Sequence, residues 1–320
     1  AQAGEPLLPE PVMHEVVHWL RPNLAAGSPG KEDRIDLLIM AFLGGGNVLL
    51  NDVPGVGKTT LAKSMARSIH GTFHRIQFTP DLLPADILGG SLYNPREGTF
   101  VFRHGPVFAN ILLADEINRA SPRTQSSLLE GMAERQVSIE GETYPLPNPF
   151  WVIATQNPVE YHGTYPLPEA QLDRFAIQIT MGYPPRTEEL EILSSHDRSS
   201  PLDGLQAVTT PAEILQAQAE VRGMHVDEDV GRYIIDIVTA TREENRLELG
   251  VSPRGSIMLY RMAQAHAYVQ GRSDVHPDDV KAVAVVTLAH RLMLETKAKY
   301  SGVTKQQVVT DILGESEVPV

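Results

Sequence analysis

The most informative segment of this chain is Asn51-Asp52-Val53-Pro54-Gly55-Val56-Gly57-Lys58-Thr59-Thr60. An apolar run, Val48-Leu49-Leu50, precedes it and predicts a buried strand, while the segment from Leu61 to Arg67 has helical spacing and no helix breaker. A strand, a glycine-rich turn and a helix, in that order, are the context in which such a turn binds phosphate. The sequence therefore predicts a phosphate-binding loop (P-loop).

The residue types in this loop suit that chemistry. Gly55 and Gly57 lack a Cβ, so the backbone can turn its N–H groups toward an anion, and the following helix adds the positive end of its dipole. We expect Lys58 to reach the β- and γ-phosphates and the Thr59 hydroxyl to ligate Mg²⁺. Asp52 departs from the glycine of the general pattern, and its carboxylate must point away from phosphate. A glycine-rich turn that merely caps a helix is the alternative. The predicted nucleotide-binding residues are Asp52, Val53, Pro54, Gly55, Val56, Gly57, Lys58, Thr59 and Thr60.

The composition is that of a folded, acidic protein. A chain of 320 residues suits two domains, since single cores stop growing near ~250 residues. Its 27 basic and 40 acidic residues give a net charge of −13, which disfavours binding to nucleic acid or to anionic membranes. It has no cysteine, which excludes disulfides and fits the cytosol. No apolar run approaches the roughly 18 residues of a membrane span, and no signal pattern opens the chain, so we expect a soluble cytoplasmic protein.

Outward from the P-loop, the hydrophobic pattern predicts a doubly wound α/β domain over residues 31–183. Continuous apolar runs are typical of strands buried on both faces of a parallel sheet. Besides Val48-Leu49-Leu50, the predicted strands are 73–78, 111–114, 150–154 and 175–179, and the predicted helices are 32–43, 61–67 and 122–134. Two predicted β-hairpins, around 98–103 and 136–146, interrupt this alternation.

The remainder of the chain is predicted to be mostly helical. Residues 1–30 contain several prolines and one amphipathic segment, 10–20, which predicts an irregular arm with a short helix. Tyr183-Pro184-Pro185-Arg186 marks a domain boundary, because two prolines stop both a strand and a helix. Residues 184–320 predict a smaller all-α domain. Its expected helices are 188–195, 212–221, 227–245, 254–270, 277–294 and 305–313.

Two acidic residues, Asp115 and Glu116, end the predicted strand 111–114. Asp115 is expected to hold Mg²⁺ through water, and Glu116 to orient or deprotonate the attacking water, as in a Walker B element. Adjacent acids at a strand end are often only solvated loop residues. The P-loop in the same chain favours the catalytic interpretation.

Three further residues are candidates for the same site. Asn157 follows a buried strand at the carboxyl edge of the sheet, where its amide can contact the γ-phosphate or the attacking water; alternatively it only begins a turn before Pro158. Arg174 can stabilise the charge on a transferring phosphoryl group. Because its own P-loop is expected to be too far away, we expect it to act across a subunit interface; the alternative is a salt bridge with Asp173 or Glu169.

Arg254 opens a helix of the second domain. It is placed to reach back to the nucleotide and so to couple the position of that domain to the nucleotide state. The alternative is an ordinary first-turn arginine on a solvated helix face.

With these residues placed, the chain resembles the AAA+ ATPases and, within them, the MoxR family. The Asp-Glu-Ile-Asn-Arg-Ala run is specific to that family, and aspartate at position 52 is common in it. The stretches that carry the resemblance run from Asp52 to Thr59, Phe78 to Asp86, Asp115 to Ala120, Ala154 to Pro158, Leu167 to Phe175 and Ser252 to Arg254.

The resemblance implies roles for these residues and a mode of action. Asn157 would be sensor 1, Arg174 the arginine finger and Arg254 sensor 2. The hairpins would be the helix-2 insert and the pre-sensor-1 hairpin, on the face or pore of a hexameric ring where substrate is contacted. MoxR-like proteins are thought to be chaperone-like ATPases, using ATP and Mg²⁺, that mature target complexes or insert metal, often with a partner carrying a von Willebrand factor A domain.

Two other functions stay open from the sequence. A nucleic-acid motor would need basic hairpins, but Arg96 and Arg103 are offset by Glu97 in the first hairpin, and the second hairpin is acidic overall. The other is a regulator that binds nucleotide and hardly hydrolyses it. We expect a protein client and neither nucleic-acid binding nor membrane insertion.

Overall fold

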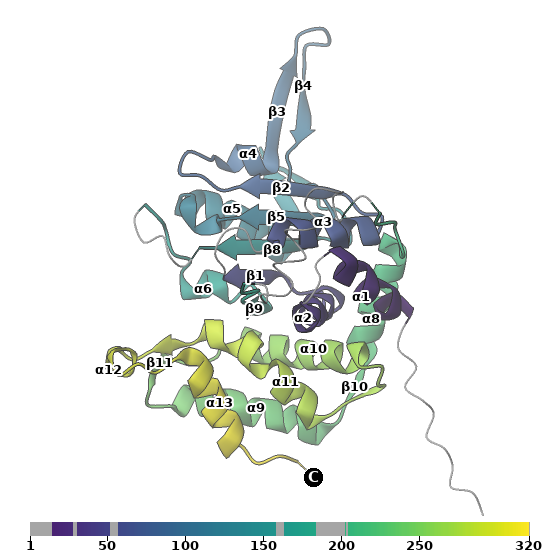
Figure 1. Cartoon of the computed structure of the whole chain (residues 1–320). Coiled ribbons are helices and arrows are strands. Elements are labelled where there is room, and N and C mark those ends of the chain that lie inside the picture. The colour runs from purple at the N-terminus through teal and green to yellow at the C-terminus, as the bar shows by residue number, and fades with distance from the viewer. Residues whose placement is uncertain are drawn as a thin grey trace, which may run out of the picture.

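The computed structural model describes residues 15–27, 31–51, 57–157, 163–183, 202 and 204–319. A parallel sheet flanked by helices lies above a layer of helices from the C-terminal part of the chain, and a long hairpin projects from the sheet end (Figure 1). The fold is α/β with a helical lid, as predicted.

The central sheet has five parallel strands in the order β2-β5-β8-β1-β9. They are β1 (Val48–Asn51), β2 (Phe73–Gln77), β5 (Ile111–Asp115), β8 (Trp151–Gln156) and β9 (Ile177–Ile179). The register places Asn51 beside Gln156 and Ala114 beside Ala154. The carboxyl ends of β1, β8 and β5 therefore form one continuous edge.

Alternate residues of the central strands pack into two separate hydrophobic layers, because successive side chains point to opposite faces. Val48 and Leu50 face a cluster that includes helices α1 (Glu15–Gly27), α2 (Glu32–Leu43) and α3 (Lys58–Ser68). Leu49 faces the other cluster, which includes α4 (Pro84–Leu88), the 3₁₀ turn η1 (Ile117–Arg119) and α5 (Pro122–Glu134). The Ser121 side chain caps α5 by accepting from the N–H of Thr124.

The lid consists of helices joined by very short strand pairs. The helices are α8 (Pro211–Gly223), α9 (Glu228–Glu243), α10 (Pro253–Val269), α11 (Pro277–Leu288), α12 (Thr296–Tyr300) and α13 (Lys305–Glu315), with the 3₁₀ turn η2 (Ala289–Arg291). The strand pairs are β10 (His225–Val226) with β12 (Asp274–Val275), and β11 (Leu247–Leu249) with β13 (Met293–Leu294). Side chains of Thr210, Asp227, Ser252 and Thr304 cap four of the helices, which is why these begin where they do.

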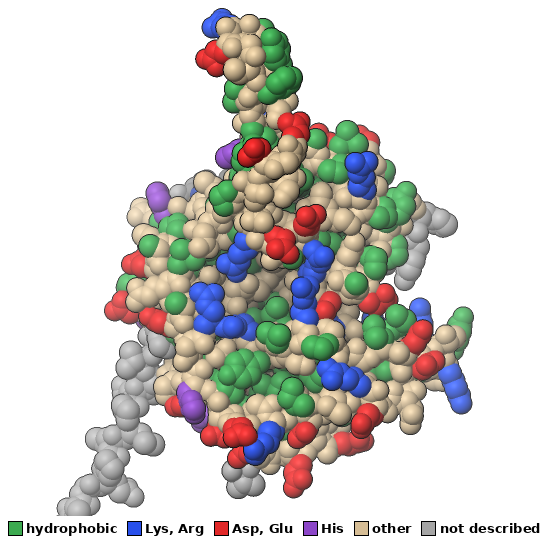
Figure 2. Space-filling model, turned by 180° about the vertical axis from the view of Figure 1, so that it is seen from behind, with side chains coloured by type: hydrophobic (Ala, Val, Ile, Leu, Met, Phe, Trp, Pro, Cys, Tyr) green, Lys and Arg blue, Asp and Glu red, His purple; other side chains and the backbone are tan. Residues whose placement is uncertain are grey.

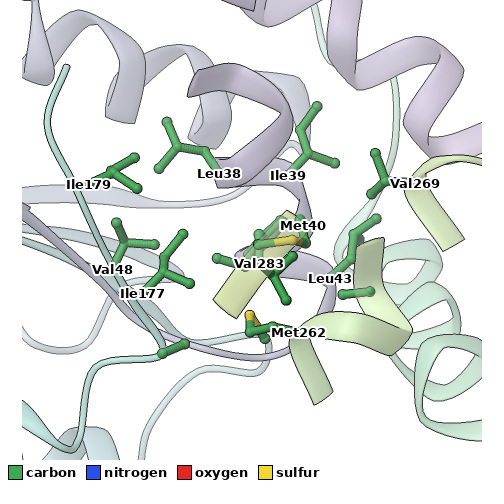
Figure 3. Close-up of a cluster of buried hydrophobic side chains, with 14 of the residues drawn as sticks. Leu38, Ile39, Met40, Leu43, Val48, Ile177, Ile179, Met262, Val269 and Val283 are labelled. Carbon is green, nitrogen blue, oxygen red and sulfur yellow. The ribbon is translucent and has the colours of Figure 1, made fainter. Parts of the chain in front are cut away.

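Helix α2 joins the two parts of the molecule. Leu38, Met40 and Leu43 of α2 lie in one buried cluster with Val48 and Ile177 of the sheet and Met262 and Val283 of the lid (Figure 3). The lid therefore shares its hydrophobic core with one face of the sheet.

The two predicted hairpins are present. The first comprises β3 (Gly89–Asn94) and β4 (Thr99–His104), and the second β6 (Gln136–Ile139) and β7 (Glu142–Pro145). The Ser91 hydroxyl donates to Glu140 Oε2 at 2.6 Å, and the rings of Phe102 and Tyr144 stack at 4.1 Å, so the base of the first hairpin packs on the second.

Several predicted boundaries differ from the structure. The described part of helix α1, Glu15–Gly27, continues through Pro22 beyond the expected end at Leu20, while the expected start at residues 10–14 lies outside the described residues. The predicted helix 277–294 stops at Leu288, because η2 turns inward to bury Arg291 and β13 then pairs with β11. Most of the expected boundary at 183–186 and the whole of segment 188–195 lie outside the described residues. The division at residues 30 and 183 thus stays a prediction.

Candidate functional site

The described end of the P-loop is a left-handed turn into α3. Gly57 has φ +86°, a backbone conformation that other residues adopt only with strain, and Lys58 follows as the first residue of the helix. Lys58 is 9% exposed, and Thr59 and Thr60 are half-buried. Asp52, Val53, Pro54, Gly55 and Val56 lie outside the described residues. The structure therefore places Lys58 and Thr59 at a helix N-terminus beyond β1, where an anion is favoured.

Asp115, the last residue of β5, is fixed through both carboxylate oxygens. The Thr155 hydroxyl donates to Oδ1 at 2.6 Å, and Arg75 donates to Oδ2 from Nη2 at 2.6 Å and from Nε at 3.2 Å. Charge-assisted hydrogen bonds of this kind hold a carboxylate in one orientation. Asp115 is thus held at the sheet edge by its neighbours on β8 and β2.

Glu116 is held by different partners. Its φ of +57° lies in the left-handed region, a conformation that costs a non-glycine residue on the order of 1 kcal/mol. Its N–H donates to the Thr155 hydroxyl at 2.8 Å, while its carboxylate accepts from Gln77 at 3.0 Å and Arg119 at 2.9 Å. In the strand order β2-β5-β8-β1, Gln77 on β2 and the P-loop after β1 lie on opposite sides of β5. The Glu116 carboxylate is therefore bonded on the side of β5 that faces away from the P-loop.

Thr155 is the residue that unites the acidic pair. Its buried hydroxyl donates to Asp115 and accepts from the N–H of Glu116, so one side chain sets the position of both acids. Thr155, Gln77, Arg75 and Arg119 are functional neighbours of the acidic pair that no catalytic motif in the sequence marks. The only signal for Thr155 was its place in the strand that precedes Asn157.

The three remaining candidates lie on separate elements. Asn157 is 7% exposed and directly follows β8, at the same edge as Asp115. Arg174, after helix α6 (Glu169–Leu172), donates to the Leu129 carbonyl at 2.7 Å. The salt bridge of Asp173 is with Arg291 of the lid and not with Arg174. Arg254 is exposed in the first turn of α10.

The donor set suits magnesium and a nucleotide. Mg²⁺ is usually held by one or two carboxylates and by substrate phosphates and water, not by an all-protein cage. Asp115 and Thr59 offer the hard oxygen ligands. Among the residues that the structure describes, no cluster of three or more metal-ligating His, Asp or Glu side chains exists. The same residues include no helix with the length and apolar content needed to cross a bilayer.

Family models identify the class of protein. One, described as ATPase family associated with various cellular activities (AAA), matches residues 47–177, and another, described as AAA lid domain, matches residues 239–312. The P-loop end, the acidic pair and the lid thus occur on an AAA+ ATPase fold.

Comparison with individual proteins narrows the class. Chaperone MoxR1 of Mycobacterium tuberculosis is 41% identical over 299 residues, which cover 91% of this chain and 79% of that protein. Protein MoxR of Paracoccus denitrificans is 34% identical over 289 residues, covering 83% and 85%. The uncharacterized protein YeaC of Bacillus subtilis is 50% identical over 291 residues, covering 91% of each. The crystal structure of a candidate ATPase from Cytophaga hutchinsonii matches with a TM-score of 0.89 at 38% identity and covers 95% of each chain. The chain belongs to the MoxR family of AAA+ ATPases.

Proposed function

We propose that this protein hydrolyses Mg-ATP to ADP and phosphate and uses the energy to remodel protein clients in the cytoplasm. The observation that carries the proposal is the shared Thr155 hydroxyl, which fixes Asp115 and Glu116 at the carboxyl edge of the sheet, the same edge beyond which β1 leads into α3. Acidic groups held in this way are suited to a metal ion and to a nucleophilic water.

In this mechanism each residue has one task. Lys58 and the N–H groups at the start of α3 bind the β- and γ-phosphates, and Thr59 and Asp115 provide oxygen ligands for Mg²⁺. Bound Mg²⁺ neutralises charge on the phosphate oxygens. Glu116 accepts a proton from the attacking water, and Asn157 orients that water or the γ-phosphate.

Glu116 has to change partners before it can act. Its carboxylate is engaged by Gln77 and Arg119, on the side of β5 away from β1. We propose that nucleotide or client binding releases it from these two donors. The arrangement suits an enzyme whose resting rate is low.

We propose that the active form is a ring of the AAA+ type, with Arg174 acting on the neighbouring subunit's ATP. A guanidinium supplied from outside the site stabilises transition-state charge and is worth about 10³- to 10⁵-fold in rate in related phosphoryl-transfer enzymes. Arg254 would contact the nucleotide of its own subunit from the lid. Six subunits are the number that the family resemblance suggests.

The first hairpin is our proposed site of contact with the protein client. Its strand pairs Leu92–Val101 and Tyr93–Phe100 point to opposite faces, and these four side chains are 51–72% exposed. Figure 2 shows hydrophobic side chains along the projecting hairpin, with charged side chains near its tip. A nucleic-acid motor would carry basic residues there, so the exposed surface favours a protein. The maturation or metal-loading of a complex, with a von Willebrand factor A domain partner, is the specific role we propose.

Steady-state ATP hydrolysis, measured across protein concentrations, tests the enzymatic proposal. Specific activity should rise with concentration as rings form. Glu116→Gln should still bind ATP but lose about 10²- to 10⁴-fold in turnover, because the proton acceptor is gone. Lys58→Ala should lose tight nucleotide binding.

Glu315→Gln provides a matched control, because Glu315 is an exposed residue at the end of α13. It should hydrolyse ATP like the wild type. Tight ATP binding with a flat, near-zero rate in every sample would instead identify a nucleotide-gated regulator.

A further inference from the structure

The lid and the segment that carries Arg174 are joined by a buried ion pair. Arg291, in the 3₁₀ turn η2, is 3% exposed, and its Nε donates to Asp173 Oδ1 at 2.9 Å. Asp173 immediately precedes Arg174. A guanidinium buried this deeply is stable only with a counter-ion and a full set of acceptors, and breaking such a pair is costly.

The remaining donors of Arg291 bond to the backbone on either side of Arg174. Nη2 donates to the carbonyl of Phe175 at 2.6 Å and to that of Asp173 at 3.3 Å, and Nη1 donates to Ala176 at 3.2 Å. Arg174 therefore lies in the backbone segment 173–176, in which the carbonyls of the residues before and after it accept hydrogen bonds from the single lid side chain of Arg291. A movement of η2 relative to the sheet would therefore strain the bonds to residues 173–176.

The same junction includes the start of α10. The Ser252 hydroxyl accepts from the N–H of Gly255 as the helix cap and donates to Asp173 Oδ2 at 2.8 Å. Gly255 leaves room for Arg291, since a Cβ added there would lie 3.0 Å from Arg291 Cδ. Asp173 thus binds η2 with one oxygen and the first turn of α10 with the other.

Arg254 lies within that first turn, between Ser252 and Gly255. Burial, with a smaller contribution from the positive charge of Arg254, lowers the pKa of Arg291 to about 10 although Asp173 opposes the shift. Arg291 is therefore protonated at neutral pH. The two arginines assigned to the nucleotide are therefore connected through a single carboxylate and its partner.

We propose that Asp173 and Arg291 are positioning residues that couple the two sites: contact of Arg254 with the subunit's own nucleotide sets the placement of Arg174 in the neighbouring site. This inference rests on the proposed ATPase function. It assigns Arg291 no contact with nucleotide. Its effect on the reaction passes through Arg174.

The test uses Arg291→Lys, which keeps the positive charge and loses the forked set of donors. The variant should bind a fluorescent ATP analogue within about threefold of the wild type, while kcat falls about 10- to 100-fold, as expected when a catalytic group is displaced by roughly 1 Å. Arg272→Lys is the matched control, because Arg272 also pairs with a buried lid aspartate, Asp279, but has no bond to residues 173–176. It should retain the wild-type kcat.

Mixed rings separate mispositioning from general damage. Glu116→Gln subunits cannot hydrolyse but keep an intact Arg174, so adding them to Arg291→Lys should raise turnover per Arg291→Lys subunit severalfold. Adding Glu116→Gln that also carries Arg174→Ala should not. Asp173→Asn is the second variant and should behave as Arg291→Lys does, with folding of both checked by melting temperature.

The outcomes separate this inference from the proposed function. If the wild type is active and Arg291→Lys has an unchanged kcat, the coupling alone is overturned. The same holds if kcat falls but neighbouring subunits with an intact Arg174 do not restore it. A loss that tracks weakened binding of the ATP analogue also overturns it, because the subunit's own site is then damaged. A wild type without turnover at any concentration overturns both.

Discussion

At the scale of single residues, the positions of Asp115 and Glu116 depend on one neutral side chain, that of Thr155. Thr155 is fully buried and is the only described side chain that bonds to both Asp115 and Glu116. Its hydroxyl both donates and accepts, which neither acid can do for the other when both are ionised. The strained backbone of Glu116 is stabilised by the same hydroxyl through its N–H.

Replacing Thr155 by Val should weaken Mg²⁺ binding at the site while keeping the volume of the side chain. The isosteric methyl group leaves Asp115 Oδ1 and the N–H of Glu116 without their partner, and loss of such an outer-shell bond typically costs about 10- to 100-fold in metal affinity or activity. We expect the Mg²⁺ concentration that gives half-maximal ATP hydrolysis to rise by a similar factor.

Thr155→Ser is the matched control, because it restores the hydroxyl and removes only the methyl group. It should recover most of the Mg²⁺ response. Equal behaviour of the Val and Ser variants would show that the hydroxyl has no part in positioning Asp115.

Among the elements, the β3–β4 hairpin has an unusual surface. A two-stranded hairpin by itself is only marginally stable in water, yet this one exposes apolar side chains on both faces. Its base is anchored on the second hairpin through Ser91 and Phe102. An exposed apolar surface of this kind is typical of a binding site.

The double variant Tyr93→Ser with Phe100→Ser tests this role. It should leave basal ATP turnover within about twofold, because the hairpin tip is remote from the sheet edge in sequence and fold. It should lose the ability to slow aggregation of a heat-unfolded test protein, monitored by light scattering, since burial of an aromatic side chain contributes roughly 2 kcal/mol.

Tyr300→Ser controls for the general loss of an exposed aromatic, because Tyr300 of α12 is 88% exposed and lies in the lid. The proposed contact is wrong if this variant and the hairpin variant suppress aggregation equally well.

Helices α10 and α11 are joined by a buried carboxylate. Asp279 is fully buried and accepts hydrogen bonds from His266 at 2.6 Å, from Arg272 and from the N–H of His276. Burial alone would raise the pKa of Asp279, but the bonds from His266 and Arg272 outweigh it and lower the pKa to about 2, from 3.8. The charged form is therefore favoured in the folded protein.

The stability of the lid should depend on this charge. Because the folded pKa lies below the unfolded one, the contribution is fully present above about pH 4 and is lost as the pH falls toward 2. Asp279→Asn should lower the free energy of unfolding by about 3 kcal/mol at pH 7. The gap between variant and wild type, measured by urea denaturation, should narrow by roughly 2 kcal/mol between pH 4 and pH 2. A gap that stays constant would mean that Asp279 is already neutral in the folded protein.

For the whole molecule, the local signals in the sequence were sufficient for the class. The P-loop, the acid pair and the apolar runs each occupy contiguous residues, so the α/β fold with a helical lid and the MoxR family were predicted and are confirmed. The assigned roles of Asn157, Arg174 and Arg254 stay predictions.

What the sequence did not indicate are pairings between distant segments. Gln77 and Arg75 meet the acid pair only because the register places β2 beside β5, and Arg291 meets Asp173 although the two are 118 positions apart in the chain. The strand pairs of the lid are two or three residues long, too short for a period of two to be visible.

Helix α2 has a further consequence for how the protein melts. Its apolar side chains pack at once against β1 and β9 and against α10 and α11, so neither the sheet nor the lid can lose its order without exposing the hydrophobic surface of the other (Figure 3). Heating should accordingly produce one cooperative transition in place of two separate ones. A ligand bound only at the sheet edge would then delay the unfolding of lid helices that it never touches.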